Sequence, residues 1–331
     1  MKRTIRSLKS VAFIVIGGLF SHTAPALDIL LTDDDGCRAP GIQALFQALT
    51  RAGHRVTLVA PDTNNSGMGY AGTVVPGARL KLMKIAERQY CVGAPDDYRM
   101  NPKQTMAIGT PVDAVMVGLD VVSAQTPPDL VVSGINFGQN VGEDLAQSGT
   151  VNAALKALGR GVPAIAISAA IDVDLARRDP QQSERNTLAA MQHAAQLLVR
   201  VIAAATDENH ADQTGARNAV NLLGLPNGAG LNINYPAVAR GAPAMVAAPV
   251  GNWREIQFHV VPHGDGEVQM NLAYSAPPPA AEMEKDGYLL KRGHIVISPL
   301  PAPARTDNAD TMAPVRHLVQ TLERGAARAR Q

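Results

Sequence analysis

The sequence predicts an α/β protein in which helices flank a mostly parallel sheet and a partly antiparallel extension follows at the C-terminus. Short apolar runs typical of buried strands alternate with amphipathic helical patterns up to residue 205. From residue 231 the pattern changes to strands separated by turn signals. We therefore expect an α/β core over residues 27–205. Residues 206–331 should complete the sheet and add a β-hairpin and a terminal helix.

Composition and charge limit the class of protein. A hydrophobic content of 46% with 4% aromatic residues is typical of a globular chain, and 331 residues suffice for one large domain or two ordinary ones. The formal net charge of +1 gives no sign of the basic surface that nucleic acids attract. We therefore expect no nucleic acid duplex among the partners.

The first 26 residues have the pattern of an export signal. A basic segment at residues 2–9 precedes an apolar run at residues 11–20, and residues 24–26 form a cleavage site of the A-x-A type. A membrane anchor is the alternative, but spanning a bilayer requires roughly 20 apolar residues. We expect a cleaved signal peptide, a periplasmic or secreted product, and no membrane association after cleavage.

The sequence contains two cysteines, Cys37 and Cys91. In an oxidising compartment such a pair can form a disulfide, which would fix the loop around Cys37. Two separate small apolar residues are the alternative. The sequence leaves both possibilities open.

The first predicted unit is strand, helix, strand. The apolar run at residues 29–31 is a strand, and Pro40 opens a helix that Gly53 ends. Residues 55–60 form the second strand, and such a unit is parallel and right-handed. The apolar face of the helix comprises Ile42, Leu45, Phe46 and Leu49.

The alternation continues through the rest of the core. We expect short strands or a hairpin within residues 71–104, with a loop at residues 92–101, and a helix that begins at Thr110-Pro111. The remaining elements are a strand at 129–132, a polar loop at 133–140, a helix from Ser148 to about residue 160, a strand at 162–168 and a helix at 183–205.

Shorter elements are predicted for the C-terminal part. Residues 206–217 have the composition of a surface loop, and a hairpin is expected around the turn at residues 263–266. The predicted elements are strands at 231–236, 255–261, 267–274 and 294–298, and a basic helix at 308–328.

Three adjacent carboxylates, Asp33, Asp34 and Asp35, end the first strand. Burying carboxylates costs several kcal/mol unless a partner compensates their charge. A strand end that binds a cation explains them, and such oxygen ligands suit Mg²⁺, Mn²⁺ or Ca²⁺ rather than zinc. A solvated acidic turn is the alternative, which the preceding apolar strand disfavours.

Two further strand ends carry oxygen ligands. Asn64 and Ser66 follow the second strand, and Asn136 follows the strand at 129–132. Ligands bind at the carboxyl ends of strands in open parallel sheets, so these groups should meet. The helix start at Ser148, Gly149 and Thr150 offers hydroxyls and free N–H groups to a phosphate, with an ordinary helix cap as the alternative. A metal ion, a phosphate and a water together suggest phosphoester hydrolysis.

Two other functions also explain the acidic stretch. Asp33 and Asp35 have the spacing of the nucleophile and acid/base pair of a haloacid-dehalogenase-type phosphatase, but Cys37 stands where Thr or Val is expected. Alternatively, an exported binding protein would capture a metal–phosphate ligand or nucleotide without turnover. Phosphate release from nucleoside monophosphates, with and without EDTA, separates the three possibilities.

Seven motifs occur along the chain in the order ILLTDDDG, APDTNNSG, GTPVDAV, DLVVSGIN, SGTVNAALKAL, GVPAIAIS and LNINYP. In this order and approximate spacing they resemble the motifs of the SurE family of survival-protein nucleotidases, strongly over residues 28–170 and more weakly to the segment GHIVISPL. Near that segment Asp286 stands where the family tends to have an aspartate.

The resemblance implies a Rossmann-like fold with an extended oligomerisation region, and a metal-dependent 5′/3′-nucleotidase or acid phosphatase that acts on nucleoside monophosphates. It implies a homo-oligomer, dimer or tetramer, and Mg²⁺ or Mn²⁺ as the cofactor. The family's metal ligands correspond to Asp34, Asp35, Ser66 and Asn136, with Asp34 and Asp35 catalytic. Substrate contacts are expected from Asn64, Ser148, Gly149 and Thr150. The family usually has Asn where this chain has Asp33.

Overall fold

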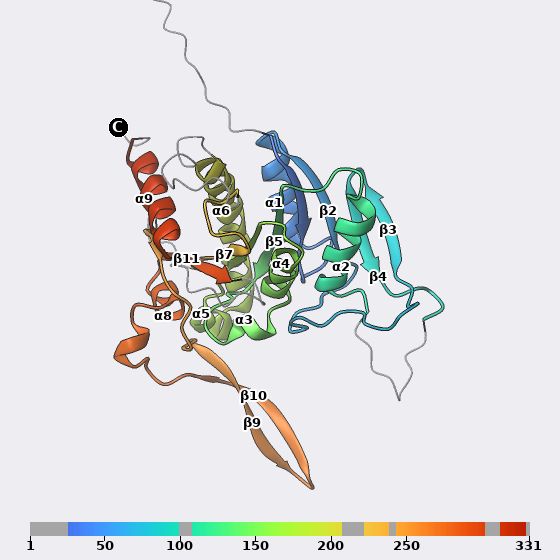
Figure 1. Cartoon of the computed structure of the whole chain (residues 1–331). Helices are drawn as coiled ribbons and strands as arrows, with labels where there is room; N and C mark the ends of the chain where they lie inside the picture. Colours follow the sequence, from blue (N-terminus) through green and yellow to red (C-terminus); the bar gives the residue numbers. More distant parts are fainter. Residues whose placement is uncertain (1–25, 99–107, 207–221, 238–242, 302–311, 329–331) are drawn as a thin grey trace, which may run out of the picture.

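A nine-stranded sheet forms the centre of the molecule in the part of the chain that the structure, a computed structural model, describes: residues 26–98, 108–206, 222–237, 243–301 and 312–328 (Figure 1). Its order is β3-β4-β2-β1-β5-β6-β7-β11-β8. The strands are β1 (Asp28–Thr32), β2 (Arg55–Pro61), β3 (Lys81–Ala86), β4 (Gln89–Gly93), β5 (Leu130–Phe137), β6 (Ala164–Ala169), β7 (Ala229–Tyr235), β8 (Met245–Ala247) and β11 (Ile295–Pro301).

The centre of this sheet is parallel, as predicted. β1 pairs in parallel with β2 on one side and with β5 on the other, and β6 and β7 continue the parallel order. Antiparallel pairing is confined to β3 with β4 and β7 with β11. Because the chain passes from β1 to opposite sides, β1 lies at a topological switch point, where open α/β sheets bind their ligands.

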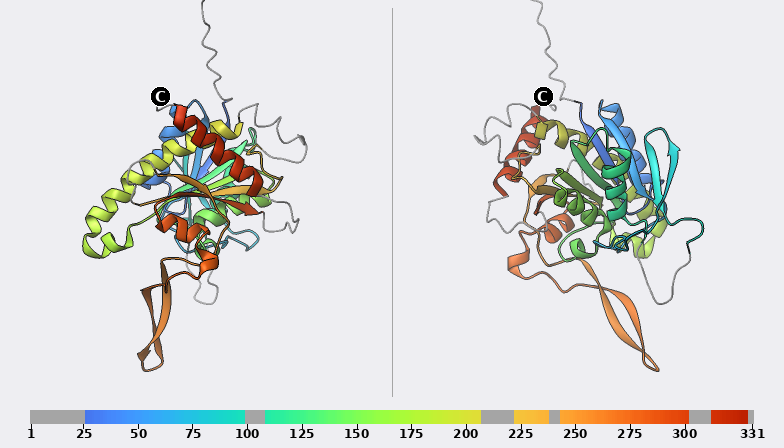
Figure 2. Two further views of the ribbon diagram at one scale, coloured as in Figure 1. Left: turned by 90° about the vertical axis from the view of Figure 1, so that its left-hand side faces the viewer. Right: turned by 45° about the vertical axis from the view of Figure 1, so that its right-hand side comes forward.

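Helices cover both faces of the sheet (Figure 2). On one face lie α1 (Pro40–Arg51), α6 (Pro180–Thr206) and α9 (Met312–Arg328), which share a hydrophobic core with Ile29 and Leu31. On the other face α2 (Pro111–Val117) and α4 (Gly149–Gly159) pack on Leu30. This alternation buries β1 on both sides, which explains its continuous apolar sequence.

α6 is the one described helix that is long and apolar enough to cross a membrane by length and composition. Half of its most apolar window is buried inside the molecule, and its buried side chains belong to the core that it shares with α1. We therefore interpret α6 as a core helix.

The predicted core elements are present, with one substantial correction. The helix expected from Pro40, the strand at 55–60 and the helix start at Thr110 all lie where the sequence places them. The loop expected at residues 133–140 is wrong for residues 133–137, which belong to β5. The pairing of β5 with β6 shifts between Ser133 and Asn136, so the strand continues past the irregularity.

The ends of other elements differ by a few residues from the ends that the sequence predicts. α6 begins at Pro180 and not at Ser183, because proline is well accommodated in the first turn of a helix. β4 includes Val92 and Gly93, which the sequence assigned to a loop. The sequence missed the short elements η1 (Gly118–Val122), α3 (Asp144–Gln147), α5 (Val173–Arg178), β8, η2 (Ala280–Glu282) and α8 (Asp286–Lys291).

The predicted C-terminal hairpin is confirmed as β9 (Ile256–Gly264) and β10 (Glu267–Tyr274), an antiparallel pair outside the main sheet. It projects from the end of the molecule at which the parallel strands finish (Figure 1). The strands expected at 231–236 and 294–298 are β7 and β11, and the terminal helix is α9. Residues 1–25 and nearly all of the surface loop expected at 206–217 lie outside the described residues.

Replacing Gly41 in α1 should destabilise the fold. A Cβ there would lie 2.0 Å from the Ile135 carbonyl oxygen of β5. We expect Gly41→Ala to lower the free energy of unfolding by about 1–3 kcal/mol, as overpacking does. Gly325→Ala in α9 is the control, since a Cβ there meets nothing within 4 Å and alanine favours helix. Urea unfolding measures both; equal effects would contradict the close packing of α1 on β5.

Candidate active site

A cavity of about 330 Å³ lies at the carboxyl ends of the central strands. One wall comes from the end of β1, the loop after β2 and the end of β5. The opposite wall comes from the root of the β9–β10 hairpin, which comprises residues 254–258 and Leu272. The lining residues include Asp34, Ser66, Asn136, Asn140, Asp144, Ser148, Arg254, Ile256, Phe258 and Leu272. The strand ends that the sequence predicted to meet therefore do meet.

Asp34 is held by the start of α4. The Thr150 hydroxyl donates a hydrogen bond of 2.5 Å to Oδ1 of Asp34, and the Asp34 side chain is almost completely buried. A Cβ on Gly149 would lie 2.7 Å from Asp34 Oδ2, so only glycine allows this approach. The Ser148 hydroxyl accepts a hydrogen bond from the N–H of Val151 as a helix cap. Thr150 and Gly149 thus orient the carboxylate, and Ser148 also lines the cavity.

Asp35 is held by two other strand ends. Its Oδ2 accepts a 2.7 Å hydrogen bond from the N–H of Phe137 in β5, and its Oδ1 accepts one of 3.0 Å from the Asn64 amide. Burial, with a smaller contribution from the charge of Asp34, raises the pKa of Asp35 to about 6 even though these hydrogen bonds lower it. Asp35 does not itself line the cavity.

Asp33 points away from the cavity into the protein. It is fully buried, its Oδ1 accepts from the N–H of Asp34, and its Oδ2 has no partner among the described residues. Burial, and then the charges of Asp35 and Asp34, raise its pKa well above the ordinary value. Burial therefore favours the protonated form of Asp33, which lessens the negative charge beside Asp34 and Asp35.

Ser66 and Asn136 supply neutral oxygen atoms. The N–H of Ser66 donates to Asn64 Oδ1 at 2.8 Å, which fixes the turn after β2. The Asn136 amide nitrogen donates to the Gly138 carbonyl at 2.7 Å, so its amide oxygen is the atom free to bind a cation. No cluster of three His, Cys, Asp or Glu residues that could hold a metal occurs in the described chain. Two carboxylates with neutral oxygens instead fit a hard ion that retains several waters.

A buried asparagine pair fixes the loop beyond β5, and sequence reasoning missed it. The Asn140 carbonyl accepts from the amides of Asn232 and Asn234, each at 2.9 Å, and the N–H of Asn140 donates to Asn234 Oδ1. Both asparagines lie on β7 within the LNINYP segment. The signal was available as alternating asparagines in an apolar strand, because buried amides require partners.

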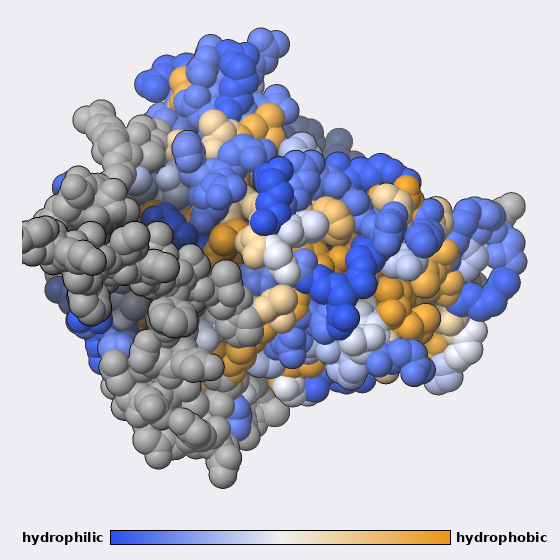
Figure 3. All heavy atoms as spheres, turned by 90° about the horizontal axis from the view of Figure 1, so that it is seen from above, coloured by the Kyte–Doolittle hydropathy of each residue, from blue (hydrophilic) through white to orange (hydrophobic). Residues whose placement is uncertain are grey.

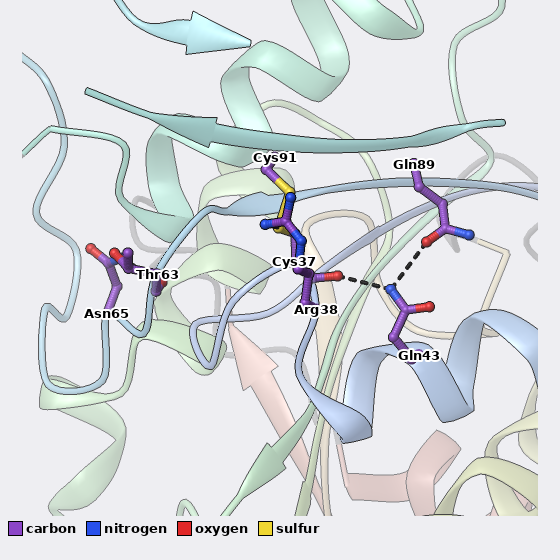
Figure 4. The surroundings of a disulfide bond; sticks show 7 residues. All are labelled: Cys37, Arg38, Gln43, Thr63, Asn65, Gln89 and Cys91. Atoms are coloured by element: carbon purple, nitrogen blue, oxygen red, sulfur yellow. Dashed lines mark hydrogen bonds between the residues drawn. A yellow bond between two sulfur atoms is a disulfide. The ribbon is translucent and has the colours of Figure 1, made fainter. Parts of the chain in front are cut away.

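A disulfide fixes the loop that follows the acidic stretch (Figure 4). Cys37 is bonded to Cys91 of β4, which confirms the first of the two possibilities that the sequence left open. The N–H of Cys37 also donates to the Pro61 carbonyl at 2.7 Å, and the Gln43 amide donates to the Cys37 carbonyl at 2.8 Å. The chain beyond Asp35 is thereby attached to β2, β4 and α1.

Fold and site together define an α/β protein whose ligand site lies at a topological switch point and is built from oxygen donors on separate strand ends. A model of the survival protein SurE family matches residues 29–256. The chain belongs to the SurE family.

Individual relatives are similar over most of their length. A 5′-nucleotidase SurE from Methanopyrus kandleri is 32% identical over 306 residues, which cover 89% of this chain and 98% of that protein. One from Nitratidesulfovibrio vulgaris strain DP4 is 33% identical over 280 residues, with coverage of 82% and 92%. The crystal structure of the SurE protein from Aquifex aeolicus has a TM-score of 0.60 at 27% identity and covers 88% of this chain and 99% of that one.

Removing the disulfide should destabilise the protein. The bridge closes a loop of 54 residues, for which chain entropy suggests a stabilisation of about 2–4 kcal/mol. We expect the double variant Cys37→Ser/Cys91→Ser to lose that much free energy of unfolding in urea. Dithiothreitol should destabilise the wild type similarly and leave the variant unchanged. A wild type that is insensitive to reductant would contradict the bridge.

Asp33→Asn should become more stable than the wild type as pH rises. A carboxyl whose pKa is raised in the folded state binds more protons folded than unfolded, so stability falls as pH rises above the unfolded pKa of about 4. Asparagine has no proton to lose, so the difference in unfolding free energy should grow from pH 4 to pH 8 in EDTA. Asp265→Asn, at the exposed hairpin tip, is the control for the same change of residue type. A pH-independent difference would show that Asp33 is not buried as a neutral acid.

Proposed function

We propose that this phosphoric monoester hydrolase of the SurE family uses a divalent cation, Mg²⁺ or Mn²⁺, to remove phosphate from nucleoside monophosphates. The observation that carries the proposal is the meeting of Asp34, Ser66 and Asn136 in one cavity, with Asp35 beside them. Relatives that are similar over nearly their whole length bear the name 5′-nucleotidase.

In this proposal Asp34, Asp35, Ser66 and Asn136 hold the metal. A bound divalent ion polarises a phosphoryl oxygen and lowers the pKa of a coordinated water. The chain's own contribution is to fix the ligands before substrate arrives. Thr150 orients Asp34, and the Asn64 amide and the Phe137 N–H orient Asp35. Such preorganisation removes the cost of arranging the ligands during the reaction.

The start of α4 is the proposed phosphate site. Ser148 lines the cavity, and the first N–H groups of the helix, at Gly149 and Thr150, lie beside Asp34. Helix N-termini bind phosphate through free N–H groups and the positive end of the dipole. Asn64, next to the metal ligands, is the remaining proposed substrate contact.

The apolar wall of the cavity supports a nucleoside as the leaving group. This wall combines side chains at the end of β5 and after β6 with residues at the hairpin root, and a purine or pyrimidine ring offers matching apolar faces. Its members are Phe137, Ile171, Ile256, Phe258 and Leu272.

The two other functions considered receive less support. A nucleophilic carboxylate must reach the phosphorus atom, but Asp33 is fully buried and does not line the cavity. That weighs against an aspartyl phosphatase that uses Asp33 with Asp35. A binding protein without turnover would capture its ligand stoichiometrically and release no phosphate. The relatives of this chain instead bear the name of a hydrolase.

An exported, oligomeric protein is part of the proposal. The basic and apolar segments within residues 1–26 and a disulfide both fit a periplasmic or secreted protein. A homodimer or homotetramer would cover the exposed apolar face of the hairpin beyond the cavity, where Val260 pairs with Met270. At the opposite end of the molecule, outside the grey region, hydrophobic areas are interspersed with hydrophilic ones (Figure 3).

Metal removal tests the proposal most directly. We expect the full-length protein to release phosphate from nucleoside monophosphates, to lose this activity in EDTA, and to regain it with Mg²⁺ or Mn²⁺. Asp34→Asn should lower kcat by a factor of about 100 or more, since it removes a ligand charge while keeping the side-chain shape. An unchanged circular dichroism spectrum is the control for folding. Wild-type turnover by Asp34→Asn at saturating metal would refute the site assignment.

A further inference from the structure

Arg254 is the one basic residue among the described residues that line the cavity. It lies just before β9, at the root of the hairpin, and lines the cavity together with Asp34, Asn136 and Ser148. Its side chain is only 12% exposed. Burying a guanidinium is costly, so the partners of each of its nitrogen atoms indicate what it does.

Two of the three nitrogens have partners on the segment that opens α3, which starts beside the hairpin root (Figure 1). Nη1 is 2.8 Å from Oδ1 of Asp144, and Nη2 is 3.2 Å from Oε2 of Glu143. The third nitrogen, Nε, is buried and has no partner among the described residues. An unpaired buried donor is unfavourable, and a guanidinium has five N–H groups, so Arg254 retains donors for an acceptor other than these two carboxylates.

The charge of the cavity indicates which acceptor. Among its described lining residues the charged groups are Asp34, Asp144 and Arg254, so Arg254 is the only cation there. The loop at residues 63–66, next to the metal ligands, reads Thr-Asn-Asn-Ser and has no positive charge. A phosphate approaching Asp34 and Asp35 without a cation would be repelled, and a guanidinium suits phosphate oxygens well.

We propose that the guanidinium of Arg254 binds an oxygen of the substrate phosphate, with Asp144 and Glu143 holding it in position. This inference rests on the proposed function and names one residue that binds its substrate. Because the two carboxylates already fix the side chain, substrate binding orders no long, flexible group. The hairpin root thereby contributes a charged group as well as apolar surface to the site.

Phosphate affinity separates this role from a purely structural one. We expect Arg254→Lys and Arg254→Gln to weaken the binding of inorganic phosphate to the Mg²⁺-loaded full-length protein by about ten- to a hundredfold, the usual value of a hydrogen bond to a charged group. KM for nucleoside monophosphates should rise similarly. The inhibition constant of the uncharged nucleoside should change less than about twofold.

Arg160→Gln is the matched control, because Arg160 likewise pairs with a carboxylate, that of Asp120, but does not line the cavity. It should keep near wild-type phosphate affinity. Equal weakening of phosphate and nucleoside in the Arg254 variants would overturn the proposal in favour of a structural role, and unchanged phosphate affinity would also overturn it. Arg254→Lys retains the charge and serves where Arg254→Gln fails to fold.

Phosphate binding, measured separately from phosphate release, also distinguishes this inference from the proposed function. Calorimetric binding of phosphate requires no turnover, so a wild type that binds phosphate but hydrolyses nothing would refute the function and leave the Arg254 test valid. A wild type that releases phosphate while the Arg254 variants bind it normally would refute only the role of Arg254.

Discussion

The placement of three consecutive carboxylates at the end of one buried strand is the constraint on which the site depends. Like charges so close together cannot all remain ionised in a buried setting. The chain gives each a different environment: Asp33 is buried with its pKa raised, Asp34 faces the start of α4, and Asp35 is bound by β5 and the loop after β2. The environment of Asp34 depends on Gly149 and on the hydroxyl of Thr150, and that of Asp35 depends on the amide of Asn64.

Much of the core could be predicted because its signals are local. The spacing of apolar residues in α1, and the apolar runs of β1, β2 and β6, are set by burial on one or both faces of a regular element. β5 was predicted to be too short because Ser133, Gly134 and Asn136 have the composition of a turn. Pairing with β6 across the irregularity, together with the pairing of Ser133 with Thr32 in β1, keeps this stretch extended. The short elements β8, α5 and α8 depend on neighbours distant in sequence, and a few residues carry too little periodicity to predict them.

The candidate site likewise has a part that could be predicted from local sequence and a part that could not. Asp34, Ser66 and Asn136 could be placed together from sequence, because parallel strands bring their carboxyl ends to one edge of the sheet. The groups that orient them could not. Thr150 lies 116 residues from Asp34, and Asn234 lies 94 residues from Asn140. A hydrogen bond over such a separation leaves no periodic pattern in the sequence.

The root of the hairpin belongs to the site rather than to the extension that it begins. Asp286 is completely buried and accepts hydrogen bonds from the N–H groups of Gly142, in the loop beyond β5, and Gly251, just before the hairpin. The Trp253 carbonyl oxygen would lie 2.7 Å from a Cβ at Gly142 and 2.2 Å from one at Gly287, so glycines at both positions allow the root to approach. The wall that carries Arg254 is therefore fixed to the loop that follows Asn136.

The root and the tip of the hairpin differ physically. The root is held by buried hydrogen bonds, whereas the paired strands beyond it expose their apolar face. The geometry of the cavity consequently depends on the root and not on the exposed strands beyond it.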